Sequence, residues 1–158
     1  MTNNINDENL FFWIQEKKDE VVKKYLSEKG IDRKDKEQRT ALINSAFYNN
    51  VNLLEWLLDN GADINMQDTI GFSALHFACQ EGHLESVIIL LKRKSNINLV
   101  DKYGNTAVWV TIMNWKGGRN LSVLKELYKC GADLTIKNNA GKAALDIIPC
   151  EILEQLKF

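Results

Sequence analysis

The chain has 158 residues, a length that suits a single domain. Its 20 basic and 21 acidic residues give a net charge of −1, so no strong field indicates nucleic acid or a membrane surface as the partner. No stretch approaches the roughly 18 apolar residues of a membrane-spanning helix, and the polar, acidic start shows no secretory signal. The three cysteines, Cys79, Cys130 and Cys150, have neither metal nor disulfide spacing. We therefore expect a reduced, cytoplasmic location and no cofactor.

The chain begins with two expected helices that form a terminal pair. Residues 9–17 predict the first helix, with Asn6 or Asp7 as its N-cap. Residues 19–28 predict its antiparallel partner, which ends at Gly30 because glycine tolerates the left-handed conformation that helix ends often need. We expect this pair to cover one end of the domain.

A unit of 33 residues then recurs along the chain. Asp35, Asp68 and Asp101 keep this interval. In the copy over residues 68–100, a turn signal and a short apolar segment precede residues 84–91, whose apolar positions have the i, i+3, i+4, i+7 spacing of one helix face. A fixed period of this size predicts a solenoid of stacked repeats.

Each unit also carries its own signal for the start of a helix. Thr40, Ser73 and Thr106 can each accept a hydrogen bond from a backbone N–H in the first turn of the helix that follows. In the last unit, residues 138–158, Pro149 opens a final helix because proline is well tolerated at a helix start. We expect this unit to close the C-terminal end.

Three departures from the period predict local structure. Gln38 takes the place of the turn glycine, so we expect a different backbone turn in the hairpin of the first full unit. Lys94 takes the place of a helix-ending glycine, where a left-handed residue with a side chain would cost about 1 kcal/mol. Gly104 and Gly141 are 37 positions apart, four more than the period, and the extra residues fall at 115–118 between two helices.

These stretches resemble the ankyrin repeat. The family pattern T-P-L-H-x-A-A-x-x-G-H, followed by an apolar helix and G-A-D, is matched best by SALHFAC at 73–79. Related stretches are TALINSA, TAVWVTI and AALDIIP at 40–46, 106–112 and 143–149, and Gly-Ala-Asp closes two units at 61–63 and 131–133. The resemblance implies one all-α ankyrin-repeat solenoid of stacked helix-turn-helix units with β-hairpin fingers. Three central repeats are expected over about 35–67, 68–100 and 101–137, between degenerate caps over about 9–34 and 138–158.

The residue types that could carry catalysis have structural explanations. His76 and His83 are the only histidines, their spacing crosses a helix break, and no cluster of other ligands completes a metal site. In the family, the first histidine ties the finger to the helix and the second lies at the turn between helices. The repeating aspartates are turn residues, and no nucleophile elbow, zinc-protease motif or complete phosphate loop is present. We therefore expect no enzyme.

Exposed apolar side chains are expected where ankyrin proteins hold their partners, at the finger tips and at the exposed ends of the first helices. The aromatic residues and the methionine there are predicted to be surplus to the core, and such patches mark interaction surfaces. The alternative left open is that some pack against neighbouring repeats, foremost Tyr103 or Met113. The candidate binding residues are Phe47, Tyr48, Ile70, Phe72, Gln80, Glu81, Tyr103, Met113 and Trp115.

The resemblance implies a non-catalytic module, monomeric on its own, that binds another protein rather than nucleic acid or membrane. No tail or second domain is visible, which favours a role as an inhibitor. The Asn- and Lys-rich, Pro-poor composition is typical of an AT-rich bacterial or similar genome, and small bacterial ankyrin proteins include immunity proteins that neutralise toxins. An adaptor or effector that recruits a host or cellular protein would use the same surface.

Overall fold

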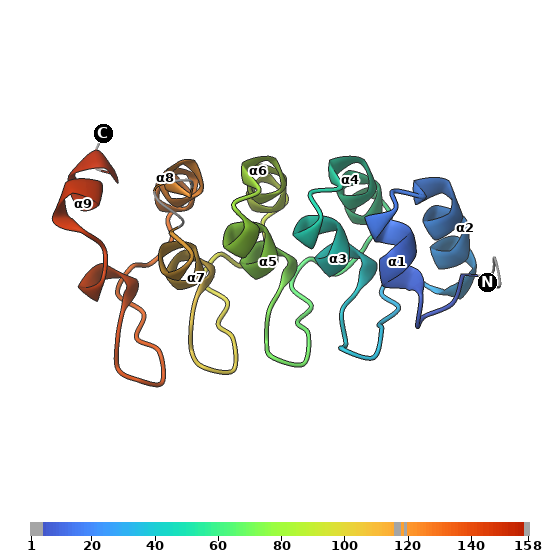
Figure 1. The fold of residues 1–158 in the computed structure, drawn as a ribbon, viewed down its shortest axis with the longest axis horizontal. Helices are drawn as coiled ribbons and strands as arrows, with labels where there is room; N and C mark the ends of the chain where they lie inside the picture. Colours follow the sequence, from blue (N-terminus) through green and yellow to red (C-terminus); the bar gives the residue numbers. More distant parts are fainter. Residues whose placement is uncertain (1–4, 116–117, 119, 157–158) are drawn as a thin grey trace.

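The helices form two parallel rows, and fingers extend below them where one unit connects to the next (Figure 1). A computed structural model describes residues 5–115, 118 and 120–156. The inner row consists of α1 (Leu10–Gln15), α3 (Ala41–Phe47), α5 (Ala74–Glu81) and α7 (Ala107–Met113). The outer row consists of α2 (Asp19–Lys29), α4 (Val51–Asp59), α6 (Leu84–Lys92) and α8 (Leu121–Lys129). The 3₁₀ helix η2 (Ala144–Asp146) and α9 (Cys150–Leu156) close the chain.

Hydroxyl side chains start the inner helices as predicted. Thr40 Oγ1 accepts the backbone N–H of Ile43 at 3.3 Å, and Thr106 makes the same contact at the start of α7. At Ser73 the cap is reciprocal, because the side chain of His76 returns to the Ser73 backbone N–H. Each contact satisfies a donor that the first helical turn leaves without a partner.

The core lies between the two helix rows. Alanines recur through the inner helices, where Ala41, Ala74, Ala78 and Ala107 are buried, so these helices can approach one another closely. The outer helices contribute larger aliphatic side chains. Those that are fully buried include Leu53, Leu54, Leu57, Val87, Leu90, Leu124 and Leu127. Each unit thus buries its apolar face against its neighbours, as a solenoid requires.

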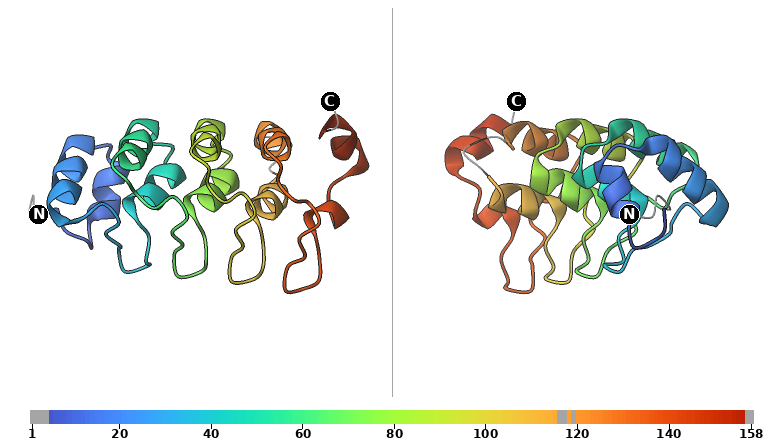
Figure 2. Two further views of the ribbon diagram at one scale, coloured as in Figure 1. Left: turned by 180° about the vertical axis from the view of Figure 1, so that it is seen from behind. Right: turned by 45° about the vertical axis from the view of Figure 1, so that its right-hand side comes forward.

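The fingers are turns rather than extended strands. In the described part of the chain, pairing between their arms is limited to one isolated antiparallel bridge at the base of each finger. The fingers run alongside one another in both views of Figure 2. None of the helices in this part of the chain combines the length and apolar character needed to cross a membrane.

The expectation of a different turn at Gln38 is wrong. Gln38 has φ 63° and its N–H bonds the carbonyl of Asp35 at 3.0 Å, as Gly71 with φ 84° bonds Asp68 at 3.0 Å. The aspartate at the start of each finger organises the turn, so Gln38 is held in the left-handed region. Lys94, with φ 63°, adopts the left-handed conformation predicted for it.

Two other details of the prediction have clear outcomes. The prediction of Asn6 or Asp7 as the N-cap of the first helix is wrong, because Asn9 occupies that position. Asn6 instead bonds Asn9, and Asp7 bonds Tyr25 and Arg33. The insertion does lie between α7 and α8, although its positions 116 and 117 fall outside the described residues. The exact limits of the central units stay predictions.

Candidate protein-interaction surface

Backbone hydrogen bonds join the finger tips into one ordered edge. Each bond runs from the N–H of one finger to the carbonyl of the finger before it, close to the turn. The pairs are Thr69 to Glu37 at 3.0 Å, Lys102 to Ile70 at 3.1 Å and Asn139 to Tyr103 at 2.8 Å. The backbone of this edge is therefore ordered before any partner arrives.

The tip edge carries apolar side chains at equivalent positions. Ile70 and Tyr103 are one period apart and are 40% and 63% exposed. Val100, on the same finger as Tyr103, is 39% exposed and was not predicted as a binding residue. The preceding tip carries Glu37 at the corresponding position. The apolar part of the edge therefore belongs to the second and third fingers.

Several predicted binding residues lie in a continuous line of aromatic rings across α1, α3 and α5. This aromatic line consists of Phe11, Phe47, Tyr48, Phe72 and Phe77, with neighbouring ring centroids 4.9 to 6.5 Å apart. The expectation that Phe47, Tyr48 and Phe72 are surplus to the core is wrong, because all three are half-buried and pack against it. They remain partly exposed to solvent.

The alternative that Tyr103 or Met113 packs against a neighbouring repeat is wrong, and both side chains are exposed as the candidate list expects. Met113 and Tyr103 are 62% and 63% exposed. Met113 lies at the end of α7, and the following unit offers only the short helix η2 in place of a full inner helix. Phe47, at the equivalent position of α3, is instead covered by Phe11 and Phe77 on either side.

The remaining predicted binding residues are less exposed to solvent than expected. Trp115 is half-buried and packs against the core from the insertion. Gln80 and Glu81 are also half-buried, and the Gln80 amide donates to the Glu81 carboxylate at 2.8 Å. The structure therefore leaves Ile70, Tyr103 and Met113 as the best exposed of the predicted set.

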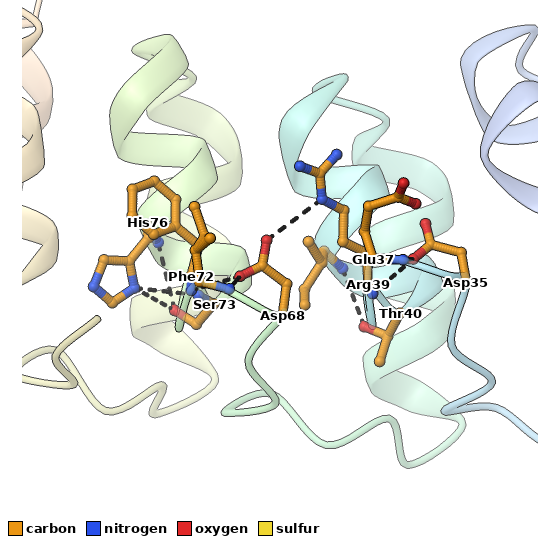
Figure 3. A network of polar contacts seen from close by, with 10 residues as sticks. Asp35, Glu37, Arg39, Thr40, Asp68, Phe72, Ser73 and His76 are labelled. Carbon is orange, nitrogen blue, oxygen red and sulfur yellow. Dashed lines mark hydrogen bonds and ion pairs between the residues drawn. The ribbon is translucent and has the colours of Figure 1, made fainter. Parts of the chain in front are cut away.

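Arg39 is a residue that the sequence analysis did not select. Its Nε donates to the buried carboxylate of Asp68 at 3.4 Å, across two fingers (Figure 3). Its guanidinium carbon lies 4.9 Å from the ring centroid of Phe77, a distance typical of a cation–π contact. Arg39 is one period before Phe72, so alignment of the units could have placed it beside the aromatic line.

Both histidines make contacts between units. The ring of His76 bonds Ser73 through Nδ1, and its Nε2 donates to the Asn105 carbonyl at 3.2 Å, which links two successive units. Burial lowers the pKa of His76 and favours its neutral form. His83 Nε2 donates to the Phe47 carbonyl at 3.0 Å. His76 thus joins α5 to the following unit, and His83 joins the start of α6 to the preceding unit.

Within the part of the chain that the structure describes, the other groups that could carry chemistry do not gather at one site. Cys79 is fully buried, and burial raises the pKa of its thiol to about 12. A thiol with this pKa is protonated at neutral pH and is a poor nucleophile. Over the residues described, no three His, Cys, Asp or Glu side chains are placed to hold a metal ion.

Comparison with known proteins agrees with the two-row architecture. A family model of three ankyrin repeats matches residues 1–68 and 53–138. The chain belongs to the ankyrin repeat family. Fowlpox virus ankyrin repeat protein FPV031 is 32% identical over 135 residues, which are 80% of this chain and 39% of that protein. Human ankyrin repeat domain-containing protein 63 is 31% identical over 91 residues, 58% of this chain and 24% of that protein.

This ankyrin chain therefore spans about two fifths or less of these relatives. Ankyrin repeats generally mediate protein–protein interaction and are known as non-catalytic modules. A second fowlpox virus ankyrin repeat protein, FPV222, is 33% identical over 135 residues, 80% of this chain and 16% of that protein. These relatives are viral and eukaryotic, so the bacterial source expected from the composition stays a prediction.

Proposed function

We propose that this ankyrin chain binds a partner protein through its second and third finger tips and the exposed end of α7. The observation that carries the proposal is the exposure of Tyr103 and Met113 on an ordered framework. Large apolar side chains at such positions contribute about 1.5–3 kcal/mol each when a partner buries them. Because the backbone of the tips is already ordered, binding loses less conformational entropy.

The aromatic line is the second part of the proposed surface. Its half-buried rings offer edges beside the exposed tips, and Arg39 adds a guanidinium held by Asp68. Aromatic residues, methionine and arginine are the side chains enriched at the centres of protein interfaces. The more exposed tip residues would supply most of the newly buried area, whereas the rings would supply shape.

The proposal is tested by affinity purification from the native cell, identification of the captured protein and measurement of its affinity with purified components. Tyr103→Ser should weaken binding about tenfold or more, equivalent to about 1.4 kcal/mol. Tyr128→Ser is the matched control, because Tyr128 is 39% exposed on the outer helix α8, away from the finger tips. Equal affinities for the two variants would reject the proposed surface.

Binding can have two consequences, which we propose as separate hypotheses. An inhibitor, including one of the toxin-immunity type, would suppress the activity of its purified partner when added at saturating concentration. An adaptor would leave that activity intact and bring the partner to a third protein. An activity assay with and without the ankyrin chain distinguishes them.

A further inference from the structure

A pocket of about 410 Å³ lies between the region of α1 and the first finger. Both basic side chains of its lining already have an acidic partner, since Arg39 pairs with Asp68 and Lys36 lies 3.8 Å from Glu37. Three carboxylates line the same space, so its lining is acidic on balance. The lining residues are Glu8, Phe11, Asp35, Lys36, Glu37 and Arg39.

The aspartate of the first finger lacks the cation partner that the aspartate of the second finger has. Asp35, Asp68 and Asp101 are buried alike, at 6 to 7% exposed, and each uses Oδ1 to accept two N–H groups of its own turn. The Oδ2 of Asp68 also accepts Arg39 Nε at 3.4 Å, and that of Asp101 accepts the Asn105 amide at 3.1 Å. Among the described residues, no group donates a hydrogen bond to the Oδ2 of Asp35. Figure 3 shows this second oxygen of Asp35 without a contact to the residues drawn. This nine-tenths-buried carboxylate therefore lines the pocket with one oxygen still available.

The residue beneath the guanidinium also differs between these two units. Arg39 lies over the ring of Phe77, and the residue one period before Phe77 is Asn44. Asn44 is 1% exposed, and neither its Oδ1 nor its Nδ2 has a hydrogen-bond partner among the residues described. An unpartnered buried amide is unfavourable. By the repeat period, a guanidinium set against Asp35 as Arg39 is set against Asp68 would lie over this amide.

We propose that the pocket binds the guanidinium of an arginine that a partner protein supplies. This guanidinium takes the place relative to Asp35 that Arg39 takes relative to Asp68 in the next unit. The free oxygen of Asp35 and the carboxylate of Glu37 accept its N–H groups, and the Phe11 ring forms an aromatic wall. A planar guanidinium suits this site better than an ammonium, because its fixed fork of donors matches carboxylates and stacks on rings. This inference rests on the proposed function, since the arginine comes from a bound protein.

The test uses N-acetyl-arginine amide as the probe, titrated into the isotope-labelled full chain and followed by NMR. Its neutral isostere, N-acetyl-citrulline amide, is the control ligand. The arginine probe should shift the backbone amides of Glu37 and Arg39 and the side-chain amide of Asn44, and citrulline should not. The lysine analogue should bind more weakly than arginine. Equal shifts with citrulline, or equal affinity for lysine, would overturn the assignment of a guanidinium site.

The matched variants are Asp35→Asn and Asp101→Asn. Asparagine preserves the turn, because Asn138 in the last finger accepts the same two backbone N–H groups through its Oδ1, at 3.0 and 3.1 Å. Asp35→Asn should weaken the arginine probe about fivefold or more, since a charge-assisted hydrogen bond is lost. Asp101→Asn should leave it unchanged, because that carboxylate faces Asn105. An unchanged affinity in Asp35→Asn would overturn the inference.

The outcome is separable from that of the proposed function. A captured partner that loses affinity in Tyr103→Ser but not in Asp35→Asn overturns the arginine pocket and leaves the proposed surface standing. If the arginine probe binds in a manner that depends on Asp35, and the affinity of the partner is unchanged in Tyr103→Ser, the pocket is supported and the tip surface is rejected.

Discussion

The ordered edge of finger tips depends on close backbone approach at Gly71, and this can be tested with two alanine substitutions. Gly71 and Gly61 both have φ 84°, so alanine carries the same conformational cost, about 1 kcal/mol, at either position. Their surroundings differ. A Cβ at Gly71 would lie 2.7 Å from the backbone nitrogen of Lys102 and 2.9 Å from Cα of Asp101, whereas a Cβ at Gly61 meets nothing within 4 Å.

Gly61→Ala should therefore lower the free energy of unfolding by about 1 kcal/mol. Gly71→Ala should lower it by about 2–4 kcal/mol, because the clash with backbone also displaces the Lys102 N–H from the Ile70 carbonyl, now 3.1 Å away. Urea unfolding followed by circular dichroism measures both values. Hydrogen exchange should be faster at the Lys102 amide in Gly71→Ala alone. Equal destabilisation by the two variants would refute the close packing of the fingers.

Three further predictions concern stability. Leu75→Ala should cost about 2–5 kcal/mol, because this side chain is 2% exposed; a cost under about 1 kcal/mol in urea unfolding would contradict its core position. Asp68→Ala should cost about 2 kcal/mol more than Asp68→Asn, since only asparagine keeps the two turn hydrogen bonds; equal costs in thermal melts would show that the turn bonds contribute little. Burial lowers the folded-state pKa of His76 below its unfolded value of 6.5, so its contribution is complete above pH 6.5 and is lost as the pH falls below it. Unfolding measured from pH 7.5 to 5.5 should show a shallower decline in His76→Gln, and parallel curves would argue against this origin of the pH dependence.

The repeat period and the helix boundaries could be predicted because they depend on short stretches of sequence. Thr40, Ser73 and Thr106 act within one turn of their own helices, and the spacing of Leu84, Val87 and Leu91 requires a helix whatever lies beside it. The place of the four-residue insertion followed from the same local signals. The family resemblance then supplied the order in which the units stack.

Side-chain exposure could not be predicted in this way, because it is decided by neighbours in adjacent units. Phe47 and Met113 occupy equivalent positions, yet Phe47 is covered by rings from α1 and α5, and Met113 has only a shortened unit beyond it. Arg39 likewise gains its role from Asp68 and Phe77, which lie 29 and 38 positions later in the chain.

By itself, the sequence determined that this protein is a solenoid with a 33-residue period, because the turns and helices that define each unit form from local interactions. Only the tertiary structure decided which apolar residues remain available to a partner and which turn carboxylate keeps an oxygen available. Both properties depend on what the adjacent unit places against a side chain. At the ends of the stack and beside the insertion, the adjacent unit is not a copy of the one before it, so the period no longer predicts the surface.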